Sequence, residues 1–346
     1  MCACFCRPDT IEGFDPRDST SIEHLPPTAA SSPFDELELG GFGGGSGSGS
    51  RAGKRMLEGL TVGIPSEYNI AELTPAVRAA WHRVAALLRD EGGARVVTVS
   101  LPSTRHALPA YYILAPAEAM SNLSRYDGVR YGHAQSKALA EEAAAAAAAA
   151  GLAAPPRGGA DAGPPAQSLR DYYTANRSGA FGDEVQRRIL VGSFVLSSRA
   201  VEGFFVKAQR IRRAITQDFS ALFRAPDVSQ RVDVLLTPTC VGAALSFGQI
   251  AHDRQHSPVA AYLNDIFTIP SNLAGIPALS VPGGLDDQGL PLGLQLLGDY
   301  HSEGRLIDVA AWIQARVQQD CGAFDPFRHN ADLIQELVQQ QEETRT

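Results

Sequence analysis

Three cysteines near the start of the sequence are the residues whose type and spacing most directly suggest chemistry. Cys2, Cys4 and Cys6 are separated by single residues, and thiolates are good ligands for soft metal ions. No second cluster of ligands follows them, so a chance cluster in an apolar start is the preferred interpretation. The other two cysteines, Cys240 and Cys321, are isolated, which is typical of a protein from a reducing compartment.

A run of glycine and serine from Gly40 to Ser50 invites comparison with a phosphate-binding loop. Such a loop follows a strand, precedes a helix and ends in Gly-Lys-Ser/Thr, and this run has none of these features. Its repetitive composition is instead typical of a flexible linker. We therefore expect residues 1–56 to be mostly disordered.

The segment from Asn264 to Gly284 has the composition of shaped, buried backbone. It contains three prolines and three glycines and is nevertheless largely apolar. Proline fixes φ and glycine permits backbone that other residues avoid, so irregular backbone lining a site is one interpretation. A core crossover between a helix and a strand is the other, and the segment alone slightly favours it.

The stretch from Asn122 to Gly132 is polar and dense in arginine, tyrosine and glycine. It is interpreted either as a turn whose arginines pair with nearby carboxylates or as a loop that presents polar groups to a cleft. The sequence leaves both interpretations open.

The composition excludes several classes of protein. The 346 residues are 44% hydrophobic, enough for a sizeable core, and the net charge is −8 without a large basic block. This balance argues against a protein that binds nucleic acid by itself through its phosphates. No stretch is long and apolar enough to span a membrane, and we expect neither a secretory signal nor an Arg-rich presequence at the start of the sequence.

The elements that must position any site begin with a strand at Leu60–Ile64. Thr74 is then a helix cap with Pro75 at the first helical position, a typical start signal. The helix is predicted to end at Gly92, and a strand follows at Arg95–Val99. Strand, helix and strand in this order predict a βαβ unit with parallel strands.

Further elements follow from periodicity and from turn residues. They are helices at 107–123, at Ser197–Phe223 and at 302–318; strands at Val232–Leu236, ended by Thr237-Pro238-Thr239, and at Leu292–Leu297; and a hairpin turn at Asp286–Gly289. Ordered structure is expected to resume at Asp183–Leu190. The fold class is α/β. Residues 57–134 and 169–335 are predicted to be two parts of one domain, separated by an Ala/Pro/Gly-rich insertion at 135–168 and followed by a polar tail at 336–346.

Four blocks of the sequence resemble the A subunit of glutamyl-tRNA(Gln) amidotransferase, an amidase-signature protein. The blocks are Leu60–Tyr68 with its following helix, Leu101–Gly132, Phe181–Phe223 and Val232–Gly298. The part from Tyr111 to Gly128 is similar to this subunit rather than to amidases in general. The resemblance implies a mixed sheet flanked by helices, with the N-terminal half of the fold missing. We expect an exposed sheet edge and exposed apolar helix faces as a result.

The resemblance also implies that the catalytic residues are absent. In the family, a lysine and two serines act upstream of a segment that resembles Gly13–Ser21. Only twelve residues precede Gly13 here, and they contain neither serine nor lysine. No residue of this chain therefore matches the triad, and Lys54 and Lys207 are not expected to be catalytic.

What the resemblance carries over is the part of the site that holds glutamine, at Tyr111, Arg188 and Asp265. A guanidinium can hold the α-carboxylate, a carboxylate can accept from the α-ammonium, and a tyrosine can close over the side chain. The alternatives are an ordinary ion pair for the charged residues and a packed ring for the tyrosine. Tyr112 could also be the matching residue in place of Tyr111.

The function implied by the resemblance is the glutaminase component of an amidotransferase that converts Glu-tRNA(Gln) to Gln-tRNA(Gln) in translation. Its implied partners are B and C subunits, with ATP and Mg at the B subunit, tRNA held mainly by the B subunit and no cofactor in this chain. The chain alone is predicted to be inactive. Alternatives are a non-catalytic scaffold or binding remnant of the same complex, and a general amidase fragment. The expected location is the mitochondrial matrix, or the cytoplasm for a bacterial protein.

Overall fold

The computed structural model describes residues 16–17, 56–128, 130–132, 176–250 and 260–320. They form two compact units. The sheet unit combines the described residues up to Leu108 with those from Arg212 onward, and the helical unit is Pro109–Ile211. Most of residues 1–56, the 135–168 insertion and the 336–346 tail lie outside the described residues, so the predictions made for them stay predictions.

The sheet unit begins with the predicted βαβ arrangement. Strand β1 is Thr61–Pro65, helix α1 is Pro75–Asp90 and strand β2 is Arg95–Val99, parallel to β1. Thr74 caps the helix, because its hydroxyl oxygen accepts a hydrogen bond from the Val77 amide at 3.5 Å. The start signal and the parallel pairing predicted from the sequence are both confirmed.

Among the described residues, five strands form one mixed sheet in the order β2-β1-β3-β5-β4. The remaining strands are β3 at Val234–Pro238, β4 at Ala278–Leu285 and β5 at Pro291–Gly298. Strand β3 is parallel to β1, whereas β5 is antiparallel to both β3 and β4. The predicted α/β class with a mixed sheet flanked by helices is confirmed.

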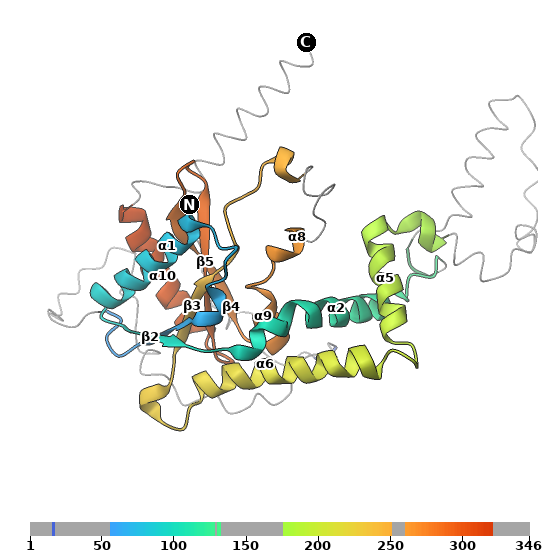
Figure 1. Ribbon diagram of the computed structural model, residues 1–346, viewed down its shortest axis with the longest axis horizontal. Helices are drawn as coiled ribbons and strands as arrows, with labels where there is room; N and C mark the ends of the chain where they lie inside the picture. The colour runs from blue at the N-terminus through green and yellow to red at the C-terminus, as the bar shows by residue number, and fades with distance from the viewer. Residues whose placement is uncertain (1–15, 18–55, 129, 133–175, 251–259, 321–346) are drawn as a thin grey trace, which may run out of the picture. The chain divides into compact units, whose positions relative to one another are not determined.

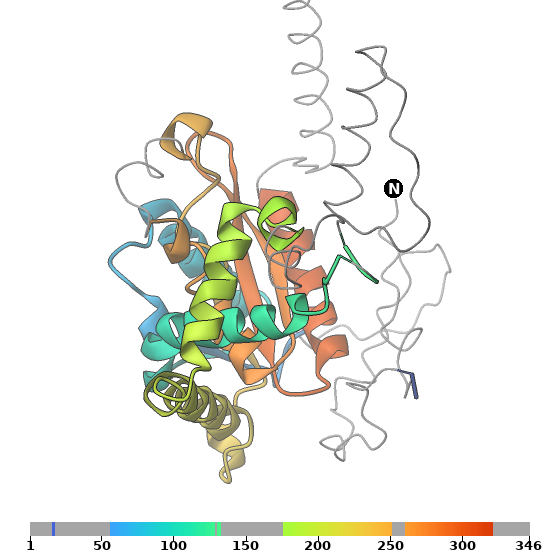
Figure 2. The same cartoon turned by 90° about the vertical axis from the view of Figure 1, so that its right-hand side faces the viewer.

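Helix α1 and helix α10, Glu303–Asp320, pack against the sheet and against each other. Figure 1 labels both helices, and Figure 2 shows α10 beside the β4–β5 hairpin. The largest fully buried side chains of the sheet come from the central strand β3 and from its neighbour β5. They are Leu235, Leu236, Leu294, Leu296 and Leu297. Burying side chains of this size supplies most of the stabilisation of such a core.

Short helical segments lie in the connections between the longer elements: η2 at Ser66–Tyr68, η3 at Pro102–His106, η5 at Val228–Gln230, α8 at Ala260–Leu263 and α9 at Ile269–Ala274. The Glu67 carboxylate joins two of these junctions. It accepts hydrogen bonds from the hydroxyls of Ser66 and Ser100 and from the Leu101 amide. The connections after β1 and β2 are thereby tied together.

The proline- and glycine-rich segment is the crossover between a helix and a strand. Helix α9 ends at Gly275, whose φ of 73° places it in the left-handed region that favours glycine. Strand β4 begins three residues later and contains a register shift between Pro282 and Gly284. Of the two interpretations of this segment, the core crossover is therefore the one observed.

The β3 boundaries differ from the prediction, because the strand runs to Pro238 instead of ending before Thr237. Thr237 and Thr239 stand at the positions of β3 that exchange backbone hydrogen bonds with β5. Because these positions alternate along an antiparallel pair, the nitrogen of Pro238 faces the opposite side, toward β1. Strand β1 pairs only with Val234 and Leu235 of β3. The missing N–H of Pro238 therefore costs no hydrogen bond of the ladder, and the strand continues through it.

The predicted hairpin between β4 and β5 is confirmed. The Asp286 carboxylate accepts hydrogen bonds from the amides of Gln288 and Leu290, at 2.9 and 2.8 Å. Gly289 has a φ of 80°, which the turn requires and which glycine adopts without strain. The turn residues therefore fix the register of the two strands.

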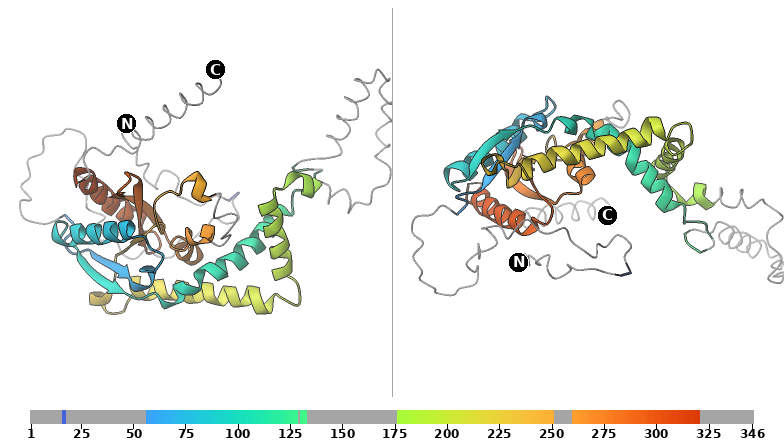
Figure 3. Two further views of the ribbon diagram at one scale, coloured as in Figure 1. Left: turned by 45° about the horizontal axis from the view of Figure 1, so that its top comes forward. Right: turned by 90° about the horizontal axis from the view of Figure 1, so that it is seen from below.

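The helical unit contains most of α2, Ala107–Leu123, together with α5, Asp183–Val195. Figure 3 shows α5 crossing α2. At this crossing a Cβ on Gly192 would overlap the Pro116 carbonyl oxygen and would lie 2.8 Å from the Cβ of Met120. A glycine at this position thus permits the close approach of the two helices.

The long helix predicted at Ser197–Phe223 is shorter in the structure. A π-helical turn, η4, spans Glu202–Val206, and α6 spans Lys207–Phe223. The Ala200 and Val201 amides both donate to the Ser197 carbonyl. The turn at 196–201 therefore separates α5 from η4, which continues directly into α6. Apolar periodicity alone does not show this break.

Candidate functional site

Asp265 lies between α8 and α9 in the sheet unit. Its backbone carbonyl closes a turn by accepting hydrogen bonds from the amides of Thr268 and Ile269, each at 3.1 Å. Its side chain is exposed, and the carboxylate makes no hydrogen bond or ion pair within the part of the chain that the structure describes. The ordinary ion pair considered as an alternative for this residue is therefore not observed there.

A buried glutamine holds the segment that carries Asp265. The Gln295 amide nitrogen, on β5, donates to the Thr237 hydroxyl and to the Phe267 carbonyl, both at 3.2 Å. Phe267 is itself buried and stacks on Tyr68 with ring centroids 5.5 Å apart. Asp265 is thus two residues from a point fixed by both hydrogen bonding and packing.

Cys240 follows β3 and lies close enough to Asp265 for the carboxylate charge to influence the thiol electrostatically. Burial raises the pKa of the Cys240 thiol, and the Asp265 carboxylate raises it further. The thiolate is the nucleophilic form of cysteine, so this environment disfavours nucleophilic catalysis by Cys240. The adjacent Thr239 hydroxyl lies 3.0 Å from that of Ser280 on β4, which adds a pair of hydroxyls to the same end of β3.

Arg188 and the paired tyrosines belong to the helical unit. The Arg188 Nε donates to Glu184 at 3.1 Å, one helical turn earlier on α5. This hydrogen bond raises the pKa of the Arg188 guanidinium; partial burial opposes it, and Tyr111 and Tyr112 add smaller contributions in the same direction as Glu184. The two tyrosine rings meet edge to face at 5.3 Å.

The structure therefore groups Tyr111, Tyr112 and Arg188 within one unit and places Asp265 in the other. Arg188 forms the ion pair considered as an alternative to substrate binding. Both tyrosines are near enough to Arg188 to influence it electrostatically, so their geometry does not choose between them.

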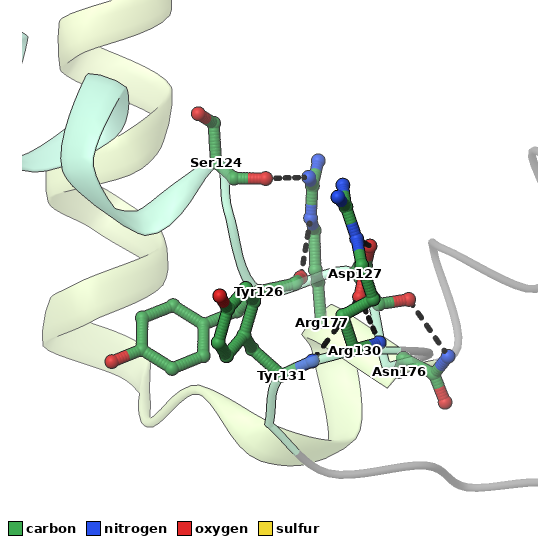
Figure 4. Close-up of polar contacts among 7 residues, drawn as sticks. All are labelled: Ser124, Tyr126, Asp127, Arg130, Tyr131, Asn176 and Arg177. Carbon is green, nitrogen blue, oxygen red and sulfur yellow. Dashed lines mark hydrogen bonds and ion pairs between the residues drawn. The ribbon is translucent and has the colours of Figure 1, made fainter.

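The arginine- and tyrosine-rich stretch forms a compact turn in the helical unit, drawn in Figure 4. Arg130 pairs with Asp127 at 3.4 Å, as expected for a turn whose arginines meet nearby carboxylates. Gly128 has a φ of 75° and donates from its amide to the Tyr131 carbonyl. The turn interpretation is therefore observed for Arg130.

Sequence reasoning missed Gln295 as a residue that supports the site. The available signal was a single amide side chain inside the otherwise apolar run Leu292–Leu297. A buried polar side chain in such a run must find hydrogen-bond partners, so its presence indicates that a polar group lies against the sheet. The sequence could not say that this group is the carbonyl of Phe267.

Other chemistry finds little support in the described residues. They contain no group of three His, Cys, Asp or Glu side chains that could hold a metal ion. Lys207 is exposed at the start of α6 and bonds no serine there, whereas Lys54 and the cysteine trio lie outside the described part. None of the described helices is long and apolar enough to cross a membrane.

A family model described as Amidase matches residues 46–307. The chain therefore belongs to the amidase family, and the resemblance drawn from its four sequence blocks is confirmed. The matched region contains Tyr111, Arg188 and Asp265.

The similar curated proteins carry the name of one particular subunit within this family. The chain is 38% identical over 313 residues to the glutamyl-tRNA(Gln) amidotransferase A subunit of Zymomonas mobilis, covering 90% of this chain and 52% of that protein. It is 42% identical to the A subunit of Gluconobacter oxydans, covering 86% and 48%. It is also 42% identical to the mitochondrial A subunit of Podospora anserina, covering 76% and 50%.

Among solved structures, the A subunit of the same enzyme from Thermotoga maritima matches with 28% identity and a TM-score of 0.47, covering 76% of this chain and 42% of that one. The chain spans about half the length of the curated relatives that it matches.

Proposed function

We propose that this chain acts as the glutamine-holding part of the A subunit of a glutamyl-tRNA(Gln) amidotransferase. In this function glutamine is hydrolysed to supply the ammonia that converts Glu-tRNA(Gln) to Gln-tRNA(Gln). The observation that carries the proposal is 38% identity across 90% of the chain to a protein of that name.

Two charged groups support a role in holding an amino acid. The Asp265 carboxylate is exposed and unpaired within the described residues, so it is available to an α-ammonium group. Arg188 uses Nε for Glu184, and its two Nη groups make no hydrogen bond in the described part. Those Nη groups can donate to an α-carboxylate without loss of the existing ion pair.

Hydrolysis of the glutamine amide requires a nucleophile and a base. The chain offers no residue that matches the serines and lysine of the family, and Cys240 is held as a thiol by burial and by Asp265. We therefore expect the chain alone to bind glutamine without hydrolysing it. The Lys and Ser residues of the reaction would come from the part of the family protein that this chain does not span.

The proposed assembly contains B and C subunits. Ammonia would pass to the B subunit, where ATP and Mg activate the glutamate of Glu-tRNA(Gln), and the B subunit would hold most of the tRNA. A mitochondrial matrix location is proposed on the similarity to mitochondrial relatives of fungi, and a cytoplasmic one applies if the protein is bacterial.

The test is glutamine binding by Asp265→Asn, measured by titration calorimetry on the chain assembled with recombinant B and C subunits. Losing a charge-assisted hydrogen bond costs about 1.5–3 kcal/mol, so we expect affinity to fall by about 10- to 100-fold. Asp287→Asn is the matched control, because it makes the same chemical change in the exposed hairpin turn and should leave affinity unchanged. Equal affinities of the two variants would remove Asp265 from the site.

Ammonia release by the same preparations separates the proposal from its alternative, a non-catalytic binding component. Glutamine binding without ammonia release, even with both partner subunits present, is the result that the alternative predicts. Glutamine hydrolysis by the chain without partners would contradict the expected inactivity.

A further inference from the structure

The turn drawn in Figure 4 is held together by hydrogen bonds to one aspartate within it, Asp127. We call it the arginine–tyrosine loop and define it as residues 124–128 and 130–132. The Asp127 carboxylate accepts hydrogen bonds from the Arg130 amide at 2.9 Å and from the Tyr131 amide at 3.4 Å, and it pairs with the Arg130 guanidinium. Its negative charge is therefore turned toward the loop's own backbone.

A second chain segment braces the loop from the other side. Arg177 donates to the carbonyls of Ser124 and Tyr126, at 2.9 and 3.4 Å, and the Asn176 amide donates to the Asp127 carbonyl at 3.5 Å. Figure 4 shows both side chains reaching the loop backbone. Tyr126 also meets Phe181 edge to face at 6.2 Å. The loop is thus held in one conformation by contacts from outside it.

The side chains left at the surface are of a particular kind. The exposed fraction is 40% for Tyr126 and 56% for Tyr131, and the Arg130 side chain is 80% exposed against 16% for Asp127. Arg125 is exposed and makes no hydrogen bond or ion pair within the described residues. The loop therefore presents two guanidinium groups and two aromatic rings outward, while its one carboxylate faces inward.

These properties are those of an interaction surface. Tyrosine and arginine are enriched among the residues that dominate the binding energy of protein interfaces. A loop that is already ordered loses little conformational freedom when it binds, so more of its contact energy appears as affinity.

We propose that the arginine–tyrosine loop docks on an acidic surface of a partner protein, namely the subunit that receives ammonia in the amidotransferase. The inference rests on the proposed function. The exposed Arg125 guanidinium favours a surface that carries carboxylates, and the exposed Arg130 guanidinium adds to this although its ion pair with Asp127 offsets part of its charge. The rings favour an apolar recess beside these carboxylates. A protein is a better match than RNA, because the chain's net charge of −8 opposes a polyanion, while two outward arginines give only a small number of phosphate contacts.

The test is the affinity of the full chain for recombinant B subunit in the presence of C subunit, titrated at low and at physiological salt. We expect Arg125→Ala combined with Arg130→Ala to weaken binding by about tenfold or more and to flatten its salt dependence. Tyr131→Ala should weaken binding at both salt concentrations. Arg89→Ala combined with Arg105→Ala is the control, since it removes the same charge from exposed positions of the sheet unit.

The loop variants replace exposed side chains, so the circular dichroism of the chain should not change. Wild-type affinity in the loop variants would overturn the inference and leave the proposed function standing. A complete failure of the unaltered chain to bind its B partner would overturn both. A labelled single-stranded RNA that binds the chain and is lost only from the loop variants, with affinity for the B partner intact, would reassign the surface to nucleic acid and overturn the inference.

Discussion

The sheet unit and the helical unit bury side chains of different size. The sheet unit buries large ones completely, among them Leu235, Leu296 and Phe219. In the helical unit the buried apolar residues are mostly small: Ala110, Ala117, Val195, Ala200 and Ala208. The same unit exposes Leu190 at 70% and Phe194 at 60%. The sheet unit completes a core of large side chains, although it also exposes Phe247 and Val228, whereas the helical unit buries mostly small residues.

This difference indicates what each unit requires. Helices that meet through glycine and alanine approach closely and gain stability from backbone contact. A group of exposed large apolar residues on α5 and η4, where the ring centroids of Phe194 and Phe204 lie 5.8 Å apart, is typical of a surface that another element covers. The exposed apolar helix face expected from the sequence resemblance is therefore present in the helical unit.

The largest expected effect on the free energy of unfolding comes from replacing one leucine by alanine in each unit and comparing the two losses. Leu235→Ala should lower the free energy of unfolding by about 2–5 kcal/mol, because it leaves a cavity in the central strand. Leu190→Ala, on the exposed face of α5, should change it by less than about 0.5 kcal/mol. Urea denaturation followed by circular dichroism measures both. Similar losses in the two variants would mean that the helical unit has a core like that of the sheet unit.

A smaller effect tests the close approach of α2 and α5. Gly192→Ala places a methyl group against Pro116 and Met120, and such overpacking costs about 1–3 kcal/mol. Gly203→Ala is the control, because nothing lies within 4 Å of its added Cβ, and alanine favours helix by about 1 kcal/mol over glycine. Hydrogen exchange of the α5 amides should speed up in the first variant only. Unchanged exchange in Gly192→Ala would show that the crossing tolerates separation.

The smallest effect concerns the pH dependence of the sheet unit. Partial burial acts to raise the pKa of the Glu67 carboxyl, but hydrogen bonds from Ser100, Leu101 and Ser66 outweigh it, so the folded-state pKa lies below the ordinary 4.5. A lowered folded-state pKa adds stability above pH 4.5, and this contribution is lost as the pH falls through the folded-state value. Glu67→Gln should reduce the loss of thermal stability on acidification in that range. An unaltered profile in the variant would assign the acid sensitivity to other carboxyls.

Much of the fold follows from local signals. Thr74 and Pro75 predicted the start of α1, and Asp286 and Gly289 predicted the turn of the β4–β5 hairpin, because capping and left-handed backbone depend on residues close in sequence. The boundaries of β3 were wrong by two residues at each end. The pairing side of Pro238 decides that boundary, and this depends on which strand lies beside it.

The candidate site was less accessible to sequence reasoning. Matching blocks selected Tyr111, Arg188 and Asp265, but only the structure shows Arg188 paired with Glu184 and Asp265 exposed without an ion pair among the described residues. The role of Gln295 in holding the Phe267 carbonyl was missed for the same reason. Each of these facts depends on neighbours that the fold brings together.

By itself the sequence determined the amidase family, the βαβ start and the hairpin, because these depend on short motifs and on residue-level backbone preferences. The tertiary structure alone decided the strand order β2-β1-β3-β5-β4, the partners of the charged residues and the outward face of the arginine–tyrosine loop. These properties arise from contacts between distant segments, whose side chains become neighbours only when the backbone hydrogen bonds of the sheet and the packing of the helices are complete.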